Sequence, residues 1–370
     1  MRRSFNYLHR REVLLIGAAL ALVIGIWGCS GTDDAPLAPA QTSTEVVLDE
    51  LMPKVKSVMA VQDRHTAALM AKQDVIGTAT TVDDNGQPAI LLLVTSKAAM
   101  DAAPSTLDGV PVKVLLTDKI VAMRSSGVSH KAKQTPPIQL GTSGGWRYDL
   151  ANGYCCGGTL GSLVQKGGTQ YIMSNYHVLE ADIVSGGNSR TAQPGDPVIQ
   201  PGLIDVNCNA ANAQNVGTLS GVKSLPNSNV DAAFAAVIAN MVRTDGAILE
   251  VGTLSASTVA ASLNQKVKKS GRTTGLSRAT VSGLNATISV SYENECAGGF
   301  AFTKTFTGQI LTTNSGSKFL AGGDSGSLMV EDITTRPRAV GLLFAGSSSV
   351  AVANPINQVL SFFGATMVGN

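Results

Sequence analysis

The chain has 370 residues, of which 44% are hydrophobic and only 15% are charged. It is too apolar and too weakly charged for an intrinsically disordered protein, so it must bury a core. Its 39 glycines and 14 prolines favour short strands and many turns, and its length leaves room for two or three domains. The formal net charge of +2 argues against a nucleic-acid-binding protein.

Residues 1–28 have the pattern of an export signal. An arginine-rich start precedes an apolar run, residues 13–27, and its 15 residues are fewer than the roughly 20 that a membrane-spanning helix needs. The run leads into Ile26-Trp27-Gly28-Cys29, which resembles the lipobox of bacterial lipoproteins. This resemblance implies that a lipid on Cys29 anchors the mature protein to a membrane, with an ordinary secretory signal as the alternative. Residues 29–44 are typical of a flexible tether.

A small α+β domain is expected over residues 45–123. Thr42 and Glu45 form a capping-box pattern, and apolar residues between 48 and 61 recur near helical spacing, although Pro53 should kink or restart that helix. An Asn-Gly turn suits a hairpin between the first two strands, and a short helix follows them. Strands are predicted over residues 75–82, 89–95, 110–116 and 119–123. No residue of this unit suggests chemistry.

Residues 124–145 are dense in Ser, Gly, Lys and Pro, as is typical of an inter-domain linker. In residues 146–370, strand-like runs alternate with Gly and Asn turns, and only residues 356–363 look helical. An all-β segment of this size suits two packed small barrels. Strands are predicted over residues 159–165, 170–174, 215–219, 231–237, 279–284, 286–292, 300–312 and 339–346.

Besides Cys29, the chain contains Cys155, Cys156, Cys208 and Cys296. A bridge between the two neighbours would be strained, so two bridges from that pair to Cys208 and Cys296 are favoured, and an exporting compartment permits them. A metal cluster is the weaker alternative, because a second Cys-x-x-Cys and a nearby histidine are lacking.

The string Gly322-Gly323-Asp324-Ser325-Gly326 is the strongest candidate for chemistry. Glycines on both sides of the serine allow a tight turn that presents its hydroxyl, while the amides of Gly323 and Ser325 converge on one point. Two such amides would stabilise the oxyanion of an acyl transfer. A turn in a glycine-rich protein is the simpler interpretation of the string.

A nucleophilic serine needs a base, and His177 is the one histidine of the β domain. Asp231 is the best candidate to orient it, because it opens an apolar strand, where an unpaired carboxylate is costly. The competing carboxylates all stand in polar, turn-like settings: Asp182, Asp196, Asp205 and Asp245.

The order of His177, Asp231 and Ser325, together with the strings that surround them, resembles the chymotrypsin-fold serine peptidases. The bacterial branch that includes alpha-lytic protease and the streptogrisins is the more similar, because residues 269–275 (Lys-Ser-Gly-Arg-Thr-Thr-Gly) look like one of its loops. The resemblance covers about residues 138–365. It implies a mainly β, double-barrel peptidase domain, residues 146–370, preceded by the small α+β domain.

The resemblance also implies roles for single residues. His177 is the general base and then acid, Asp231 its orienter, and Ser325 the nucleophile, and Asp324 pairs with Arg272 as structural support. The primary specificity pocket would be formed by Phe319 at its base and by Phe344, Ala345 and Gly346 as its wall. Since that base holds no carboxylate, trypsin-like cleavage after Lys or Arg is not expected. The chain departs from the family where Val178 follows the histidine and where Ser327 replaces a second glycine.

The sequence thus predicts an exported, lipid-anchored or secreted serine endopeptidase of a bacterial cell envelope. Its partners would be protein or peptide substrates and, through Cys29, a membrane. Neither a metal nor a cofactor is implied. A catalytically silent binding lipoprotein on the same scaffold and a serine esterase are the alternatives.

Overall fold

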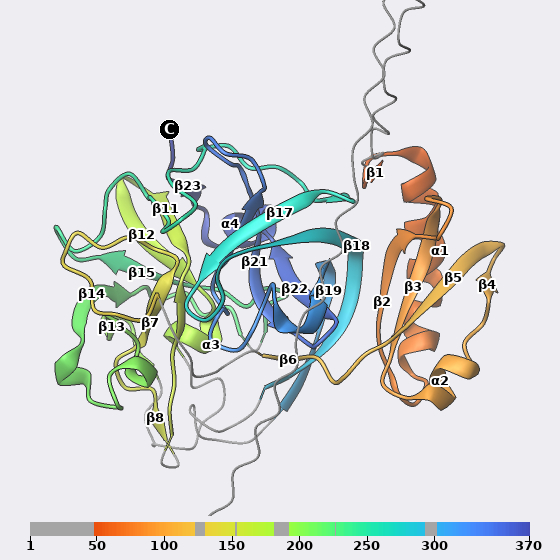
Figure 1. Ribbon diagram of the computed structural model, residues 1–370, viewed down its shortest axis with the longest axis horizontal. Helices are drawn as coiled ribbons and strands as arrows, with labels where there is room; N and C mark the ends of the chain where they lie inside the picture. Colours follow the sequence, from red (N-terminus) through yellow and green to blue (C-terminus); the bar gives the residue numbers. More distant parts are fainter. Residues whose placement is uncertain (1–47, 123–129, 152–153, 181–191, 226, 293–301) are drawn as a thin grey trace, which may run out of the picture. The chain divides into compact units, whose positions relative to one another are not determined.

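The structure is a computed structural model that describes residues 48–122, 130–151, 154–180, 192–225, 227–292 and 302–370. These residues fall in one compact unit, Glu45–Asn370, which is mainly β, as predicted (Figure 1). The export signal and Cys29 lie outside the described residues. Within the described ranges, no helix is long and apolar enough to span a bilayer.

The first barrel is an eight-stranded sheet in the order β10-β7-β13-β14-β15-β12-β11-β23. It closes because β10 and β11 are one strand interrupted at Gly161: β10 pairs with β7, and β11 pairs with β12. The strands are β7 (Thr142–Trp146), β10 (Gly158–Leu160), β11 (Ser162–Lys166), β12 (Thr169–Ser174), β13 (Pro197–Gln200), β14 (Gln214–Leu219), β15 (Ala233–Val237) and β23 (Thr366–Met367).

The second barrel is a ring of six strands, β17-β20-β21-β22-β19-β18, which closes through the additional pairing of β17 with β18. Its strands are β17 (Lys266–Gly271), β18 (Gly275–Tyr292), β19 (Phe302–Thr313), β20 (Leu328–Glu331), β21 (Ala339–Gly346) and β22 (Val350–Pro355). Helix α4 (Ile356–Phe363) follows and buries one apolar face. Two closed sheets in sequence confirm the predicted double-barrel architecture.

The expected α+β unit is present, and its sheet continues that of the second barrel. Strand β2 (Val75–Val82) pairs with β18, and the sheet extends through β3 (Pro88–Val94) and β5 (Val110–Leu116) to β4 (Thr106–Leu107). In Figure 1 these orange strands lie beside β18, with α1 (Pro53–Met70) and α2 (Lys97–Asp101) against them. The buried Gln62 of α1 donates to the Asn285 carbonyl of β18, which ties the helix to the barrel strand.

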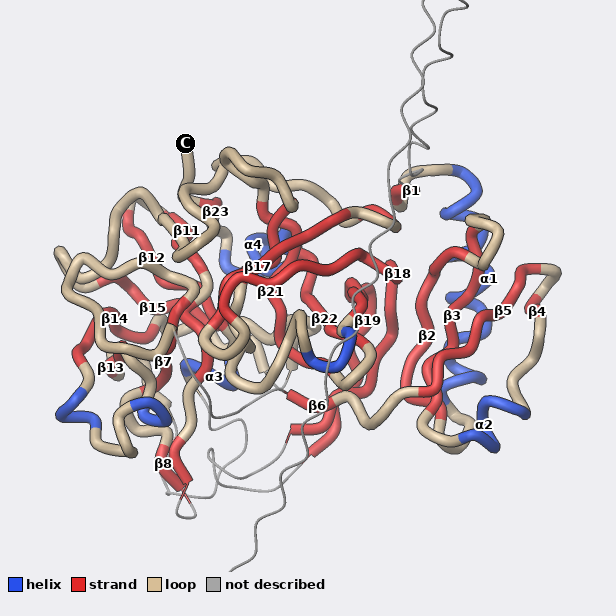
Figure 2. The backbone as a smooth tube through the Cα atoms, viewed as in Figure 1, coloured by secondary structure: helices blue, strands red, loops and turns tan. Residues whose placement is uncertain are grey.

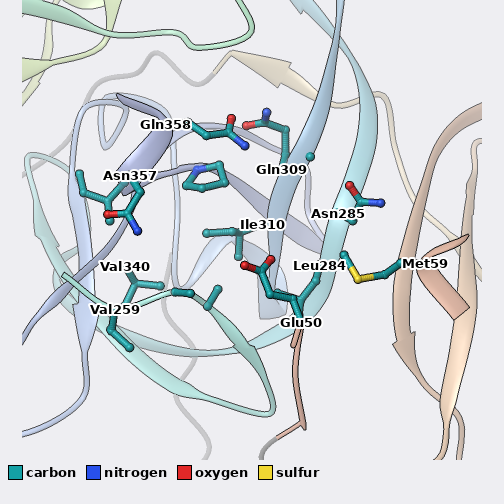
Figure 3. A pocket seen from close by; sticks show the side chains of 15 residues that line it. Glu50, Met59, Val259, Leu284, Asn285, Gln309, Ile310, Val340, Asn357 and Gln358 are labelled. Atoms are coloured by element: carbon teal, nitrogen blue, oxygen red, sulfur yellow. The ribbon is translucent and has the colours of Figure 1, made fainter. Parts of the chain in front are cut away.

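Two short segments extend this contact. Strand β1 (Leu48–Asp49) pairs with β16 (Ser262–Leu263), and β6 (Val121–Ala122) lies between β18 and β21. A cavity of about 230 Å³ opens where α1 faces the barrel, lined on one side by Glu50 and Met59 and on the other by residues such as Gln309 (Figure 3).

Three sequence expectations need correction. The first helix begins at Pro53, where the missing proline N–H costs nothing, and residues 48–49 form a strand instead. Residues 279–292 form one strand with bulges, not two strands. The supposed linker ends in the fully buried β7, whose glycines serve close packing: a Cβ at Gly144 would lie 2.4 Å from Leu160 Cγ.

In the tube view of Figure 2, α3 (Tyr176–Leu179) is a single helical turn that follows β12. It lies in the first core cluster, with Val178 and Leu179 packed among the strand residues of barrel one. The second barrel has its own core, which includes Phe306 and Phe344. Tyr176 of α3 belongs to this second cluster, so the turn that carries His177 packs against both cores.

Candidate active site

Ser325 lies in a turn that both barrels clamp. The Thr159 amide of β10 donates to the Ser325 carbonyl at 2.9 Å, and the Gly326 amide donates to the Leu343 carbonyl of β21 at 2.9 Å. Gly323 and Gly326 have φ values of +90° and +92°, which favour glycine. The expected turn chemistry is therefore present, and it fixes the backbone on either side of the serine.

His177 and Asp231 meet on the other side of this turn. The imidazole Nδ1 lies 2.6 Å from Asp231 Oδ2, and both side chains are fully buried. The His177 amide donates to Asp231 Oδ1 at 3.3 Å. The carboxylate therefore contacts both the ring and the backbone of the same histidine, which is the arrangement that orients an imidazole.

Further contacts position the loop that carries Asp231. Asn175 Nδ2 donates to the Asp231 carbonyl at 2.7 Å, and the Asp231 amide donates to Asn354 Oδ1 at 2.9 Å. Tyr292, the last residue of β18, donates its hydroxyl to Asp231 Oδ2 at 2.8 Å. Asn354 and Tyr292 belong to the second barrel, so the carboxylate bridges both barrels.

Gly158 shows how closely the histidine turn and the serine turn approach. A Cβ at Gly158 would lie 2.5 Å from Val178 Cγ2, next to His177, and 2.9 Å from the Ser325 carbonyl oxygen. The Ser325 hydroxyl itself donates to the Phe344 carbonyl at 3.3 Å. The turn that carries Ser325 and the turn that carries His177 thus lie against the same glycine, and the assembly of all three residues into a triad stays a prediction.

Asp324 accepts a dense set of hydrogen bonds behind the serine. The Thr273 and Thr274 amides donate to its Oδ1, and the Ala321 amide and Thr274 hydroxyl donate to its Oδ2. Lys269 Nζ lies 3.1 Å from Oδ2, and both side chains of this pair are fully buried. Burial lowers the pKa of Lys269, while the adjacent Asp324 opposes this shift.

The bidentate partner of Arg272 corrects the sequence expectation. Its Nε and Nη2 donate to Asp205 Oδ2 and Oδ1, each at 2.6 Å, while Asp324 pairs with Lys269. Ser143 and Lys131 also contact the Asp205 carboxylate. Asp205 was expected to be solvated, as one of the aspartates in polar, turn-like settings. It is 5% exposed because its partners come from distant strands.

The remaining competitors of Asp231 have other partners where the structure describes them. Asp196 accepts from the Trp146 indole at 3.1 Å, and Asp245 pairs with Arg243 on the surface. Asp182 lies outside the described residues. These contacts leave Asp231 as the carboxylate that faces the histidine ring.

The residues of the predicted specificity pocket are buried inside the second barrel. Phe319 is 1% exposed and packs in a core cluster with Leu320 and Leu343, and its carbonyl accepts from the Ser277 hydroxyl. Phe344, Ala345 and Gly346 form the end of β21. Of these three residues, Phe344 contacts the serine through its carbonyl, and their role as a pocket wall stays a prediction.

Glu180 is a buried carboxyl that the sequence did not single out. It follows His177 by one helical turn and is 2% exposed. Burial raises its pKa to about 8; Lys223 opposes this shift and Asp231 adds to it. A polar residue in a short motif gives no sign of such burial, because the burial comes from the barrel core.

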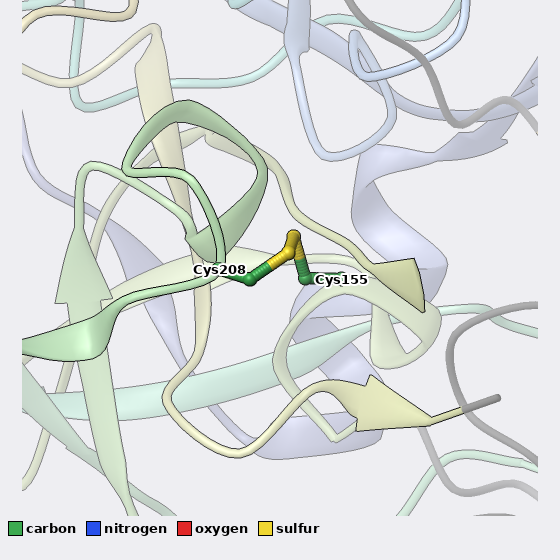
Figure 4. Close-up of a disulfide and its surroundings, with 2 residues drawn as sticks. All are labelled: Cys155 and Cys208. Atoms are coloured by element: carbon green, nitrogen blue, oxygen red, sulfur yellow. A yellow bond between two sulfur atoms is a disulfide. The ribbon is translucent and has the colours of Figure 1, made fainter. Parts of the chain in front are cut away.

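The described cysteines agree with the expectation that the neighbouring pair forms bridges to distant cysteines. Cys155 and Cys208 form a disulfide that joins β9 (Tyr154–Cys155) to the loop after β13 (Figure 4). Cys156 is also disulfide-bonded. Cys296 lies outside the described residues, so its place in a second bridge stays a prediction. Among the residues that the structure describes, no group of His, Cys, Asp and Glu suits a metal ion.

No family model and no curated protein matches this chain. Similar solved structures include a glutamic acid-specific serine protease at 20% identity and Thermobifida fusca protease A at 21% identity, with TM-scores of 0.40 and 0.41. They cover 62% and 63% of this chain and 100% and 99% of their own chains.

An alpha-lytic protease homologue is also similar, with 20% identity, a TM-score of 0.36, and coverage of 56% of this chain and 91% of its own. These neighbours are bacterial serine proteases of the chymotrypsin fold, the class that the motifs predict. Since the TM-scores lie below 0.5, the assignment of the fold rests on the two closed sheets described above.

Proposed function

We propose that the chain is a serine endopeptidase that hydrolyses peptide bonds through an acyl-enzyme on Ser325. The observation that carries this proposal is the buried 2.6 Å contact between His177 Nδ1 and Asp231 Oδ2 beside the serine turn. A buried imidazole with one nitrogen held by a carboxylate has its other nitrogen directed to accept a proton.

In the proposed reaction, Ser325 Oγ attacks the substrate carbonyl carbon while its proton passes to His177 Nε2. The oxyanion accepts from the amides of Gly323 and Ser325, and each such donor contributes about 3 kcal/mol. The imidazolium then gives its proton to the leaving amine, the C–N bond breaks, and an acyl ester remains on the serine. His177 deprotonates a water molecule, which hydrolyses the ester and restores Ser325.

The proposed primary specificity is supported by the apolar side chains of Phe319 and Phe344, which would line the pocket for the substrate side chain. A carboxylate there would select Lys or Arg, so we propose a preference for small or apolar side chains instead. Cleavage of a peptide library predominantly after Lys or Arg would refute this preference.

The pairing of β6 with β21 supports a proposal for how a peptide would enter the candidate active site. Strand β6 pairs antiparallel with β21, Val121 opposite Gly346 and Ala122 opposite Ala345. This register advances along β21 toward Phe344, whose carbonyl accepts from the Ser325 hydroxyl. We therefore propose that the segment after β6 is a substrate of the same site and that the protein cleaves itself within residues 124–145.

The proposed compartment is outside the cytoplasm, with a lipid on Cys29 as the anchor. The Cys155–Cys208 disulfide supports an oxidising compartment. The intact mass of protein isolated from membranes tests both modifications, because lipidation adds mass at the amino terminus and cleavage of the linker divides the chain.

A fluorophosphonate probe tests the proposed activity. We expect labelling of the wild type that disappears in Ser325→Ala and falls sharply in His177→Ala. Absence of labelling in folded wild-type protein would favour the binding lipoprotein. Turnover of small esters without cleavage of any peptide would favour the esterase.

A further inference from the structure

The Asp231 carboxylate receives a second side-chain donor that the triad pattern does not include. Tyr292 Oη lies 2.8 Å from Asp231 Oδ2, the same oxygen that faces His177 Nδ1 at 2.6 Å. The other oxygen, Oδ1, accepts from the His177 amide. One oxygen therefore serves the imidazole and the phenol together, and the carboxylate is held at both ends.

The surroundings of Tyr292 fix its hydroxyl in this position. The side chain is 3% exposed, and its ring stacks on Phe302 with centroids 4.9 Å apart and an angle of 8°. The edge of the His177 ring lies against it, at 5.9 Å and 65°. The backbone pairs with Phe302 across the β18–β19 hairpin, so neither the ring nor the main chain can move independently.

We propose that Tyr292 is a positioning residue for the proposed peptidase reaction, in which it orients the Asp231 carboxylate and moderates the charge that His177 experiences. The inference rests on the proposed function of the His177–Ser325 pair. A hydrogen bond to an ionised acceptor draws negative charge onto the donor. With the phenol in place, Oδ2 is a weaker acceptor for the imidazole and is confined to one position.

Two other charged groups interact with this carboxylate, and a test must leave them unchanged. Glu180 directly follows α3, and Lys304 extends from β19, while Lys223 acts on Glu180. Ser224 holds the adjacent backbone by accepting from the Ala232 amide. Tyr292→Phe removes only the phenolic oxygen and keeps the ring stack, so it alters one donor among these groups.

The decisive experiment needs no turnover. We would follow the imidazole carbon resonances of His177 by NMR against pH in the full chain carrying Ser325→Ala, and repeat the titration after adding Tyr292→Phe. The lost donor leaves more negative charge on Oδ2, so the protonated imidazole is stabilised. We expect the titration midpoint to move about half to one pH unit upward. The matched control is Tyr171→Phe, a partly buried tyrosine of β12, and it should leave the midpoint unchanged.

An unchanged or lower midpoint in folded Tyr292→Phe overturns the proposal. If that variant does not fold, 3-fluorotyrosine at position 292, a stronger donor of the same shape, replaces it. The midpoint should then move downward, and an unchanged or higher one overturns the proposal. These readouts are independent of activity, so failure of the wild type to label with fluorophosphonate refutes the proposed function separately.

In an active enzyme, the same variant separates binding from catalysis. We expect Tyr292→Phe to lower kcat about tenfold and to leave KM within twofold, because the phenol lies behind Asp231 and does not contact the substrate. The acidic limb of the pH profile of kcat/KM should move upward with the NMR midpoint. A kcat within twofold of the wild type contradicts the positioning role.

Discussion

Two buried clusters of charge flank Ser325, and they differ in what they can do. On one side, an imidazole meets the Asp231 carboxylate. On the other, Lys269 meets Asp324 and Arg272 meets Asp205, with every side chain at most 5% exposed. An imidazole can exchange a proton near neutral pH, whereas a guanidinium cannot. The first cluster is suited to chemistry, and the second to holding the serine turn in place.

We expect the largest difference between the two clusters in the catalytic rate. We expect His177→Ala to lower kcat/KM for a peptide substrate by a factor of about 10⁴ or more, since the serine loses its base. His65→Ala is the matched control, because this half-exposed histidine of α1 contacts only Asp108 among the ion pairs of the described residues. Comparable losses in both variants would contradict the assignment of the first cluster.

The supporting cluster should instead dominate stability. In a Ser325→Ala background, Lys269→Met leaves the Asp324 carboxylate buried without its cation, and we expect a loss of about 3–5 kcal/mol in the free energy of unfolding. Urea denaturation measures this loss. Arg64→Met breaks an exposed pair with Asp108 and should cost far less, because solvent screens the two charges. Equal losses would mean that burial does not distinguish the two pairs.

The buried Glu180 carboxyl, which follows the His177 turn, should make the stability of the protein depend on pH. Burial raises the pKa of the Glu180 carboxyl to about 8 in the folded protein, whereas its ordinary value is 4.5. Between these two pH values the carboxyl is protonated in the folded protein and ionised in the unfolded chain. Its contribution to stability is therefore complete below pH 4.5 and is lost as pH rises through 8. Glu180→Gln should match the wild type within about 1 kcal/mol at pH 5 and exceed it by a few kcal/mol at pH 9.

Thermal melts of both proteins in the Ser325→Ala background across this range provide the measurement. A constant difference between Glu180→Gln and its parent at all pH values would show that the carboxyl does not titrate as its burial implies. Asp101→Asn, at an exposed pair with Lys97, serves as the control that should show no such trend.

Part of the candidate site could be predicted from local motifs. The serine turn, the histidine after a strand and the aspartate before one are each recognisable from neighbouring residues, and the structure brings the histidine and the aspartate into contact. The two-barrel architecture followed from the same alternation of strands and turns. Most of what could be predicted therefore came from short sequence motifs and from the alternation of strands and turns.

Tyr292 and Asp205 were missed for a physical reason. Their partners, Asp231 and Arg272, lie 61 and 67 residues away in sequence and are reached only through the closure of the barrels. The buried β7 was mistaken for linker because small residues are common to both. Composition alone does not distinguish glycines that allow close packing from glycines that allow flexibility.

The most direct test of the central claim is to trap the acyl group. Full-length protein is mixed with p-nitrophenyl acetate, quenched in acid, digested and analysed by mass spectrometry. We expect an acetyl group on the peptide that contains Ser325, absent in Ser325→Ala and strongly reduced in His177→Ala. Acetylation that is missing from this peptide, or that is unchanged in His177→Ala, would contradict the account.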